Sequence, residues 1–143
     1  MKIIIDTNVI FSALLNTNGI IGELLFNSKD VLEFYSCAYM RDEIHRHWEK
    51  LKKISRLSDA NLNASFDLLL TKILFIDEGL IPPDVWLEAE LLVKDIDIDD
   101  IDFVALTIHL GGGLWTGDKT LYGRLKAKQF SHVYTTTELA LLR

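Results

Sequence analysis

The segment that decides the fold reads Asp95-Ile-Asp-Ile-Asp-Asp-Ile-Asp102, continues as Phe-Val-Ala-Leu-Thr-Ile-His109, and is followed by Gly113-Leu-Trp-Thr-Gly-Asp118. Its first eight residues contain five acids interleaved with isoleucines, although apolar side chains gain nothing from exposure to water. A helix that starts near Asp100 therefore carries this acid beside an apolar face. The short β-type run at 114–116 then delivers Asp118 at its carboxyl end. Two acids are thus predicted at element ends that can face one cleft.

Short apolar runs alternate with stretches of helical spacing along the whole chain. The expected strands cover 2–5, 32–36, 74–76, 114–116 and 132–135. The expected helices cover 9–15, 20–27, 38–55, 62–70, 84–93, a segment starting near 100, 119–128 and 138–142. Asp59 or Asn61 is expected to cap the fourth of these helices. This alternation predicts a parallel sheet covered on both faces. The fold class is therefore α/β: one three-layer α/β/α domain over residues 1–143 with a central parallel sheet.

Composition predicts an ordinary globular protein. The chain has 143 residues, 49% hydrophobic and 25% charged, which suits a single sizeable core. Its one cysteine, Cys37, excludes an internal disulfide and fits a reducing compartment. Asp6 interrupts the apolar N-terminus after three isoleucines, and no apolar run approaches membrane-spanning length. We therefore expect a soluble, cytoplasmic protein without a membrane association.

Charge is distributed unevenly. The formal net charge of −6 argues against a general, charge-driven grip on nucleic acid. However, six of the 15 basic residues lie between Arg41 and Arg56, and four more lie between Lys119 and Lys128. The stretch 84–102 holds eight acids against Lys94 alone. Two basic segments therefore flank an acidic cluster.

Four acids from distant parts of the chain fall at element ends. Asp6 ends the first expected strand, Asp118 follows the strand at 114–116, and Glu43 and Asp100 lie near helix starts. In open parallel sheets the functional cleft lies at the carboxyl ends of the strands. Carboxylates packed there repel one another, and a cation removes that conflict. Oxygen ligands without nearby cysteine or paired histidine favour a hard ion such as Mg²⁺ or Mn²⁺.

The order and spacing of these residues resemble the PIN domain, a family of metal-dependent ribonucleases that includes the VapC-type toxins of toxin–antitoxin pairs. The resemblance covers essentially the whole chain and is carried by Asp6-Thr-Asn8, Glu43, Asp100 seven residues before Thr107, and Thr116-Gly-Asp118-Lys119. Thr107 stands where the family commonly has alanine. The resemblance implies a PIN-like fold in which Asp6, Glu43, Asp100 and Asp118 hold one or two Mg²⁺ or Mn²⁺ ions and form the catalytic site.

The same resemblance implies an activity and its partners. A bound metal activates water for attack on an RNA phosphodiester and stabilises the leaving oxygen. Asn8 and Thr116 are expected to support the site by orienting the carboxylates. The expected substrate-binding residues are Arg46, Lys50, Lys53 and Lys119, with Arg124 beside them. The expected partners are an RNA substrate, an antitoxin protein and a second copy of the chain in a homodimer.

Other interpretations of the same residues remain open. Asp6 is also a common helix-capping residue, and Glu43 alone suits the first turns of a helix. A basic stripe is more often a solvated helix face than an RNA track. Asp97 or Asp102 could share the role given to Asp100. At the level of function, one alternative is a catalytically silent PIN-like module that binds RNA or protein. Another is an aspartyl-phosphate domain, although Asn8 stands where such phosphatases need a second aspartate.

Overall fold

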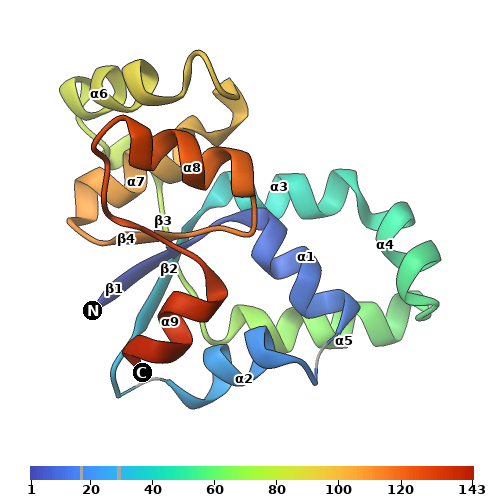
Figure 1. Cartoon of the computed structure of the whole chain (residues 1–143). Coiled ribbons are helices and arrows are strands. Elements are labelled where there is room, and N and C mark those ends of the chain that lie inside the picture. Colours follow the sequence, from blue (N-terminus) through green and yellow to red (C-terminus); the bar gives the residue numbers. More distant parts are fainter. Residues whose placement is uncertain (17, 29) are drawn as a thin grey trace.

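The computed structural model describes residues 1–16, 18–28 and 30–143, and within them five parallel strands form one sheet (Figure 1). The strands are β1 (Lys2–Ile5), β2 (Glu33–Cys37), β3 (Leu74–Ile76), β4 (Gly113–Trp115) and β5 (Val133–Tyr134). Their order across the sheet is β3-β2-β1-β4-β5, and every neighbouring pair is parallel. The predicted α/β class and parallel sheet are confirmed, with the ends of three strands shifted by one residue.

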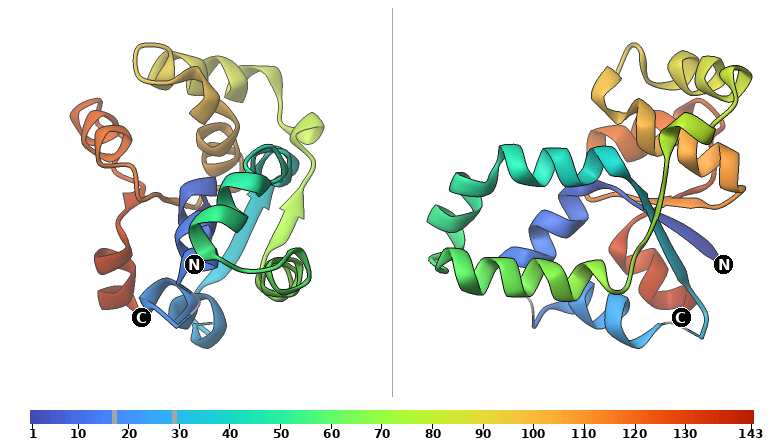
Figure 2. Two further views of the ribbon diagram at one scale, coloured as in Figure 1. Left: turned by 90° about the vertical axis from the view of Figure 1, so that its right-hand side faces the viewer. Right: turned by 180° about the vertical axis from the view of Figure 1, so that it is seen from behind.

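Helices cover the sheet on both faces. They are α1 (Thr7–Leu15), α2 (Ile20–Asn27), α3 (Ala38–Arg46), α4 (Trp48–Ser55), α5 (Asp59–Leu70), α6 (Pro83–Val93), α7 (Ile101–Leu110), α8 (Lys119–Ala127) and α9 (Thr136–Leu142). In Figure 1, α6, α7 and α8 lie above the sheet, while α1, α2, α5 and α9 lie below it. The two further views in Figure 2 show the same three layers, with α3, α4 and α5 forming an arm that extends from one side.

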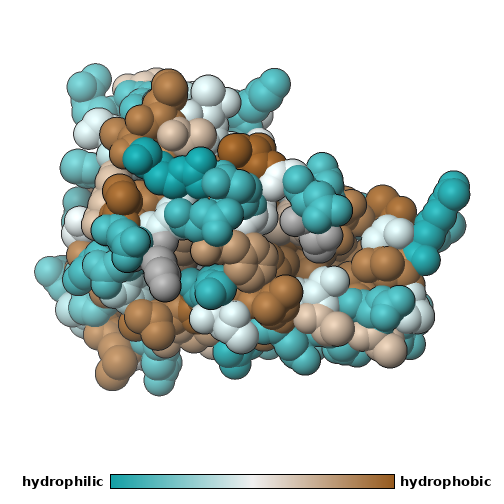
Figure 3. All heavy atoms as spheres, turned by 90° about the horizontal axis from the view of Figure 1, so that it is seen from below, coloured by the Kyte–Doolittle hydropathy of each residue, from teal (hydrophilic) through white to brown (hydrophobic). Residues whose placement is uncertain are grey.

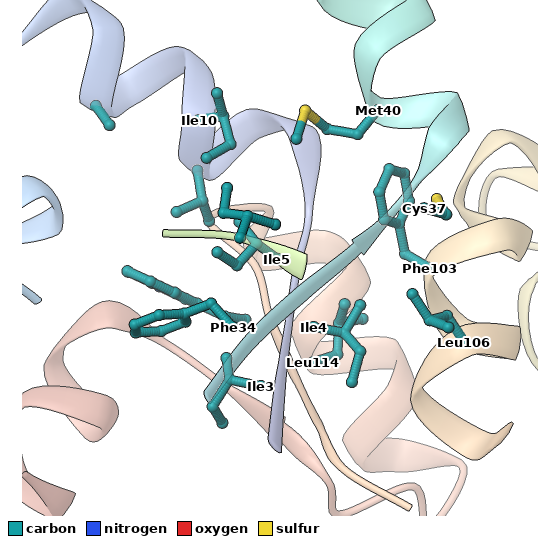
Figure 4. Close-up of a cluster of buried hydrophobic side chains, with 14 of the residues drawn as sticks. Ile3, Ile4, Ile5, Ile10, Phe34, Cys37, Met40, Phe103, Leu106 and Leu114 are labelled. Carbon is teal, nitrogen blue, oxygen red and sulfur yellow. The ribbon is translucent and has the colours of Figure 1, made fainter. Parts of the chain in front are cut away.

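The central strand β1 is buried on both faces. Ile3, Ile4 and Ile5 are all fully buried, which explains why this strand reads as an uninterrupted apolar run. Successive side chains point to opposite faces of a strand. Figure 4 shows Ile3 and Ile5 on the side of Phe34 and Ile4 on the side of Leu106. Packing in the core therefore fixes the position of β1 and of Asp6, the residue that follows its carboxyl end.

The single helix predicted over 38–55 is wrong, because two helices form there. α3 ends at Arg46 and α4 begins at Trp48, with His47 between them at φ −104° and ψ 15°. The His47 ring packs edge-on against Phe11 of α1, with 5.6 Å between ring centroids. The apolar spacing continues through the break, so the sequence pattern does not reveal it. As a consequence, Arg46 lies on a different helix from Lys50 and Lys53.

Other helix ends also differ from the expectation. Ser58 caps α5, since its Oγ accepts from the Asn61 backbone N–H at 3.1 Å, so the predicted cap at Asp59 or Asn61 is wrong. The acidic segment first forms a 3₁₀ turn, η2 (Ile98–Asp100), before α7 begins. Among the described residues no single helix is long and apolar enough to cross a membrane; only α1 and α2 taken together, at 109° to one another, reach that length and composition.

Candidate metal centre

The candidate site lies where the order of the sheet reverses. The chain runs from β1 outward through β2 to β3, and later from β4 outward to β5, so β1 and β4 meet at the switch point. Ligands of open parallel sheets bind at such a point, beside the carboxyl ends of the strands. Asp6 and Thr116 are the first residues after these two strands, and the Asp6 backbone N–H donates to the Trp115 carbonyl at 3.0 Å.

A hydrogen-bond network ties Asp6 to the loop after β4. The Thr116 hydroxyl donates to Asp6 Oδ2 at 2.8 Å and accepts from the Asp118 backbone N–H at 3.0 Å. Asn8 Nδ2 donates to the same Asp6 oxygen at 3.3 Å and to Thr116 Oγ1 at 3.4 Å. Asn8 Oδ1 accepts from the Gly117 N–H at 2.9 Å. Asn8 and Thr116 therefore orient Asp6 and fix the loop that carries Asp118.

The Asp6 carboxyl is used for this network and not for helix capping. It directly precedes α1, but in the part of the chain that the structure describes its side chain makes no capping bond to that helix. Burial is the main cause that raises the pKa of Asp6 to about 6, and the charges of Glu43 and Asp118 raise it further. The hydrogen bond from Thr116 acts in the opposite direction. A buried carboxyl held among like charges suits a cation ligand better than a structural cap.

Glu43 reaches the same place from α3. The Thr7 hydroxyl donates to Glu43 Oε1 at 2.6 Å, so the residue next to Asp6 holds this carboxylate. Burial raises the pKa of Glu43, while the Thr7 hydrogen bond and the charge of Arg46 lower it. Thr7 lies within the Asp6-Thr-Asn8 motif, but the sequence does not indicate that its hydroxyl binds Glu43. Only its position between Asp6 and Asn8 could have suggested it.

Asp100 and Asp118 complete the group. Asp118 Oδ1 caps α8 by accepting from the Thr120 and Leu121 N–H groups at 2.9 and 3.1 Å. Asp100 Oδ2 is buried and has no hydrogen-bond partner among the described residues. Burial raises the pKa of Asp100 to about 8, and the charges that raise it further are those of Asp6, Asp97, Asp118 and Glu43.

This arrangement fits a divalent cation. The charges of Glu43 and Asp118 raise the pKa of Asp6, and the charges of Asp6, Asp118 and Glu43 raise the pKa of Asp100, so the four predicted carboxyl groups lie in one region of the structure. A buried carboxylate oxygen without a partner costs free energy that a cation would recover. Carboxylate oxygens are the ligands that Mg²⁺ and Mn²⁺ prefer. Asp97 contributes charge, but its Oδ1 accepts from the Asp99 N–H at 3.0 Å within η2.

The predicted basic residues divide into two groups. Arg46 lies at the rim of the acidic site, because its charge acts on Glu43 and its Nη2 donates to Tyr39 Oη at 3.0 Å. Lys119 lines a hollow of about 230 Å³ together with Thr116 and Asp118. Lys50 lines a separate, mostly apolar groove between α1 and α4.

Two further basic residues make no hydrogen bond or ion pair with the four candidate ligands in the part of the chain that the structure describes. Lys53 is exposed on α4 and makes no hydrogen bond or ion pair that the described part of the chain shows. Arg124 donates to the Asp95 carbonyl at 2.9 Å, and this hydrogen bond holds the start of the acidic segment. The structure thus brings Arg46 and Lys119 to the site, and it does not bring Lys50 or Lys53 there.

A second group of possible ligands lies nearby. One ligand atom from each of Cys37, Glu78 and Asp102 lies within 4.8 Å of the others. Sequence reasoning gave no role to Glu78, and the only signal for it is its position two residues after β3.

Comparisons with known proteins agree with this fold. A family model described as PIN domain matches residues 4–137. VapBC2 from Rickettsia felis, solved bound to a DNA fragment from its promoter, is 15% identical over 94% of this chain and 97% of that chain, with a TM-score of 0.67. PAE2754 from Pyrobaculum aerophilum is 13% identical over 99% of this chain and 89% of that chain, with a TM-score of 0.69. No curated protein matches in sequence. Because the family model spans nearly the whole chain, the chain belongs to the PIN domain family.

Proposed function

We propose that this chain is a Mg²⁺- or Mn²⁺-dependent endoribonuclease. The observation that carries the proposal is the convergence of Asp6, Glu43, Asp100 and Asp118 at the switch point of the sheet, with one buried Asp100 oxygen lacking a partner among the described residues. Membership of the PIN domain family supports it, since these domains are generally nucleases. An aspartyl-phosphate phosphatase needs a second aspartate two residues after the first, and here Asn8 occupies that position and donates to Asp6 Oδ2.

The side chains around the site have distinct tasks in this proposal. Asp6, Glu43, Asp100 and Asp118 would hold the ion, and Asn8, Thr116 and Thr7 keep their oxygens in place through the hydrogen bonds described above. A bound ion lowers the pKa of a coordinated water and stabilises charge on a phosphodiester. Arg46 and Lys119 stand beside the acids and would bind the RNA backbone. The acids must lose their protons before they bind the ion, so low pH opposes the activity.

We also propose that the protein is the toxin of a toxin–antitoxin pair. The similarity to VapBC2 from Rickettsia felis supports an antitoxin partner. A homodimer is the second expected assembly. Ile20 of α2 and Leu141 and Leu142 of α9 are between 50% and 83% exposed, on two helices that contact one another. Figure 3 views this side of the molecule and shows apolar patches broken by polar side chains. Size-exclusion chromatography with light scattering tests the dimer, and a monomer at all concentrations would contradict it.

Cleavage of a defined RNA by the purified chain tests the main proposal. We expect cleavage with Mn²⁺ or Mg²⁺ and none with EDTA. Asp6→Asn and Asp118→Asn should each abolish cleavage while the chain stays folded, whereas Glu90→Gln, a change at an exposed acid on α6, should not alter it. Cleavage that persists in EDTA or in both active-site variants would refute the proposal. RNA binding without turnover in Mn²⁺ would favour the silent module instead.

A further inference from the structure

A polar hollow adjoins the candidate metal centre at the carboxyl ends of β4 and β5. Its volume is about 230 Å³, and it is lined by Thr116-Gly-Asp118-Lys119 with Tyr122, and by Thr135-Thr-Thr137. The first stretch follows β4 and the second follows β5, which pairs with β4 in parallel. Thr116 and Asp118 therefore belong both to this hollow and to the metal centre, so a substrate held at the acids can extend into the hollow.

The threonines on the far side of the hollow stand on a backbone that hydrogen bonds hold in place. Thr135 Oγ1 accepts from the Glu138 N–H at 3.2 Å, and the Thr135 N–H donates to Glu138 Oε1 at 3.0 Å. This capping box fixes the first turn of α9. Thr136 and Thr137 are the first two residues of that helix, so their positions in the hollow are fixed as well.

The Thr136 hydroxyl has one hydrogen bond formed and one donor left. Its Oγ1 accepts from Trp115 Nε1 at 3.0 Å, and the Trp115 side chain is fully buried. An indole N–H can only donate, so the proton of the Thr136 hydroxyl must find its acceptor elsewhere. Among the described residues neither this proton nor the Thr137 hydroxyl has a hydrogen-bond partner. Both hydroxyls are therefore available to a ligand in the hollow.

Charge and size select the kind of group that the hollow takes. Among its described lining residues, Asp118 and Lys119 carry opposite charges and the other side chains are uncharged. A phosphate inside it would meet the charge of Asp118 as well as that of Lys119. Hydroxyls both donate and accept hydrogen bonds, which suits a neutral group with the same property. The volume lies below the roughly 300–1,000 Å³ of pockets for drug-sized ligands, so it suits one sugar ring better than a whole nucleotide.

We propose that this hollow binds a ribose of the RNA substrate and that Thr136 and Thr137 bind its 2′-hydroxyl. This inference rests on the proposed function and deepens it, because it concerns how the site selects RNA over DNA. The ribose belongs to a nucleotide beside the scissile phosphate, since the hollow and the metal centre share two residues. The 2′-hydroxyl is the group that distinguishes RNA from DNA. In metal-assisted hydrolysis the attacking oxygen comes from water, so the 2′-hydroxyl is not consumed and serves recognition alone.

Cleavage of RNA strands that carry a single deoxyribose tests the proposal. An RNA oligonucleotide with one mapped cleavage site is compared, in Mn²⁺, with copies that have one 2′-deoxy nucleotide at each position around that site. The net contribution of one neutral hydrogen bond corresponds to about 2–10-fold. The kcat/KM of the parent chain should therefore fall by this factor at one position next to the scissile phosphate, and distant positions should have no effect.

Variants assign this deoxy penalty to the threonines. Thr136→Val should cleave the all-RNA strand about 2–10-fold less efficiently, and the deoxy change should then cost little more, because its partner is already lost. Thr136→Ser keeps the hydroxyl and should keep the penalty of the parent chain. Thr137→Val should also reduce the penalty; it leaves Trp115 with its partner, so it decides the matter if Thr136→Val does not fold. Ser131→Ala, at an exposed hydroxyl outside the hollow, should match the parent chain on every strand.

Three results would overturn the inference. A parent chain that cleaves RNA without any deoxy penalty beside the scissile phosphate makes no contact with a 2′-hydroxyl. An undiminished penalty in every valine variant that folds would place that contact outside the hollow. A loss in Thr136→Ser equal to that in Thr136→Val would exclude the hydroxyl as the cause. A parent chain that cleaves no RNA in Mn²⁺ refutes the proposed function and this inference with it, whereas a parent that cleaves RNA restricts the failure to the hollow.

Discussion

Replacing Asp100 by asparagine should stabilise the metal-free protein while it destroys the metal centre. In the folded chain Asp100 is partly buried, with its Oδ2 shielded from solvent, and burial together with the charges of Asp6, Asp97, Asp118 and Glu43 raises its pKa from 3.8 to about 8. The folded state therefore binds a proton that the unfolded state has lost at neutral pH. Stability falls as pH rises between these two values, because the folded chain must either keep that proton or bury a repelled charge. An asparagine of nearly the same shape carries no charge and avoids this cost.

The size of the effect follows from the shift. One pKa unit corresponds to about 1.4 kcal/mol, so the full shift sets an upper limit of several kcal/mol. Residual solvent exposure and relaxation of the neighbouring acids reduce this, and we expect a gain of about 2 kcal/mol at pH 7. For a chain of this length that corresponds to a rise of about 5–10 °C in melting temperature.

The assay is thermal unfolding in EDTA at several pH values. Asp100→Asn should melt higher than the parent chain at pH 7 to 8, and the difference should shrink as pH falls toward 3, below the unfolded pKa of 3.8, where Asp100 is protonated in both states. Asp99→Asn, a change at the exposed neighbouring acid, should shift the melting temperature little. In parallel, Asp100→Asn should lose Mn²⁺ binding. A variant that melts lower than the parent at every pH, or binds Mn²⁺ normally, would refute this reasoning.

Three further predictions concern the same site. Thr116→Val removes the hydroxyl that joins Asp6 Oδ2 to the Asp118 N–H. The free energy of unfolding, measured with denaturant, should fall by about 1–3 kcal/mol, and Mn²⁺ binding should weaken by about 10–100-fold. An Mn²⁺ affinity equal to that of the parent chain would contradict this prediction. Mn²⁺ affinity should rise from pH 6 to pH 8, because protons on Asp6 and Asp100 compete with the ion, and calorimetry showing a pH-independent affinity would exclude this competition. Arg46→Ala should raise KM for RNA several-fold with little change in kcat, and a selective fall in kcat would instead assign Arg46 to the chemical step.

The parts of the fold set by local pattern could be predicted from the sequence. β1 and β3 form where short apolar runs predicted them, and the ends of β1 and β4 place Asp6 and Asp118 at one edge because parallel strands share a direction. The candidate ligands could be predicted from the sequence for the same reason. They occur next to the ends of strands and helices, and four acids in such positions are unusual unless something compensates their charge.

The parts that depend on tertiary contacts could not be predicted. The break at His47 is invisible to apolar spacing, because buried residues recur at helical intervals on both sides of it. For that reason the basic stripe from Arg46 to Lys53 does not form one helix face. The roles of Thr7 and Thr136 arise from hydrogen bonds to residues 36 and 21 positions away, and no local signal marks such pairs.

The most direct test of the central claim is the position of Mn²⁺, located by anomalous X-ray scattering in crystals grown with the ion. The account predicts a peak bounded by carboxylate oxygens of Asp6, Glu43, Asp100 and Asp118, within about 2.0–2.2 Å of the oxygens that bind it directly. A peak at Cys37, Glu78 and Asp102 instead, or no peak among the four acids at saturating Mn²⁺, would contradict it.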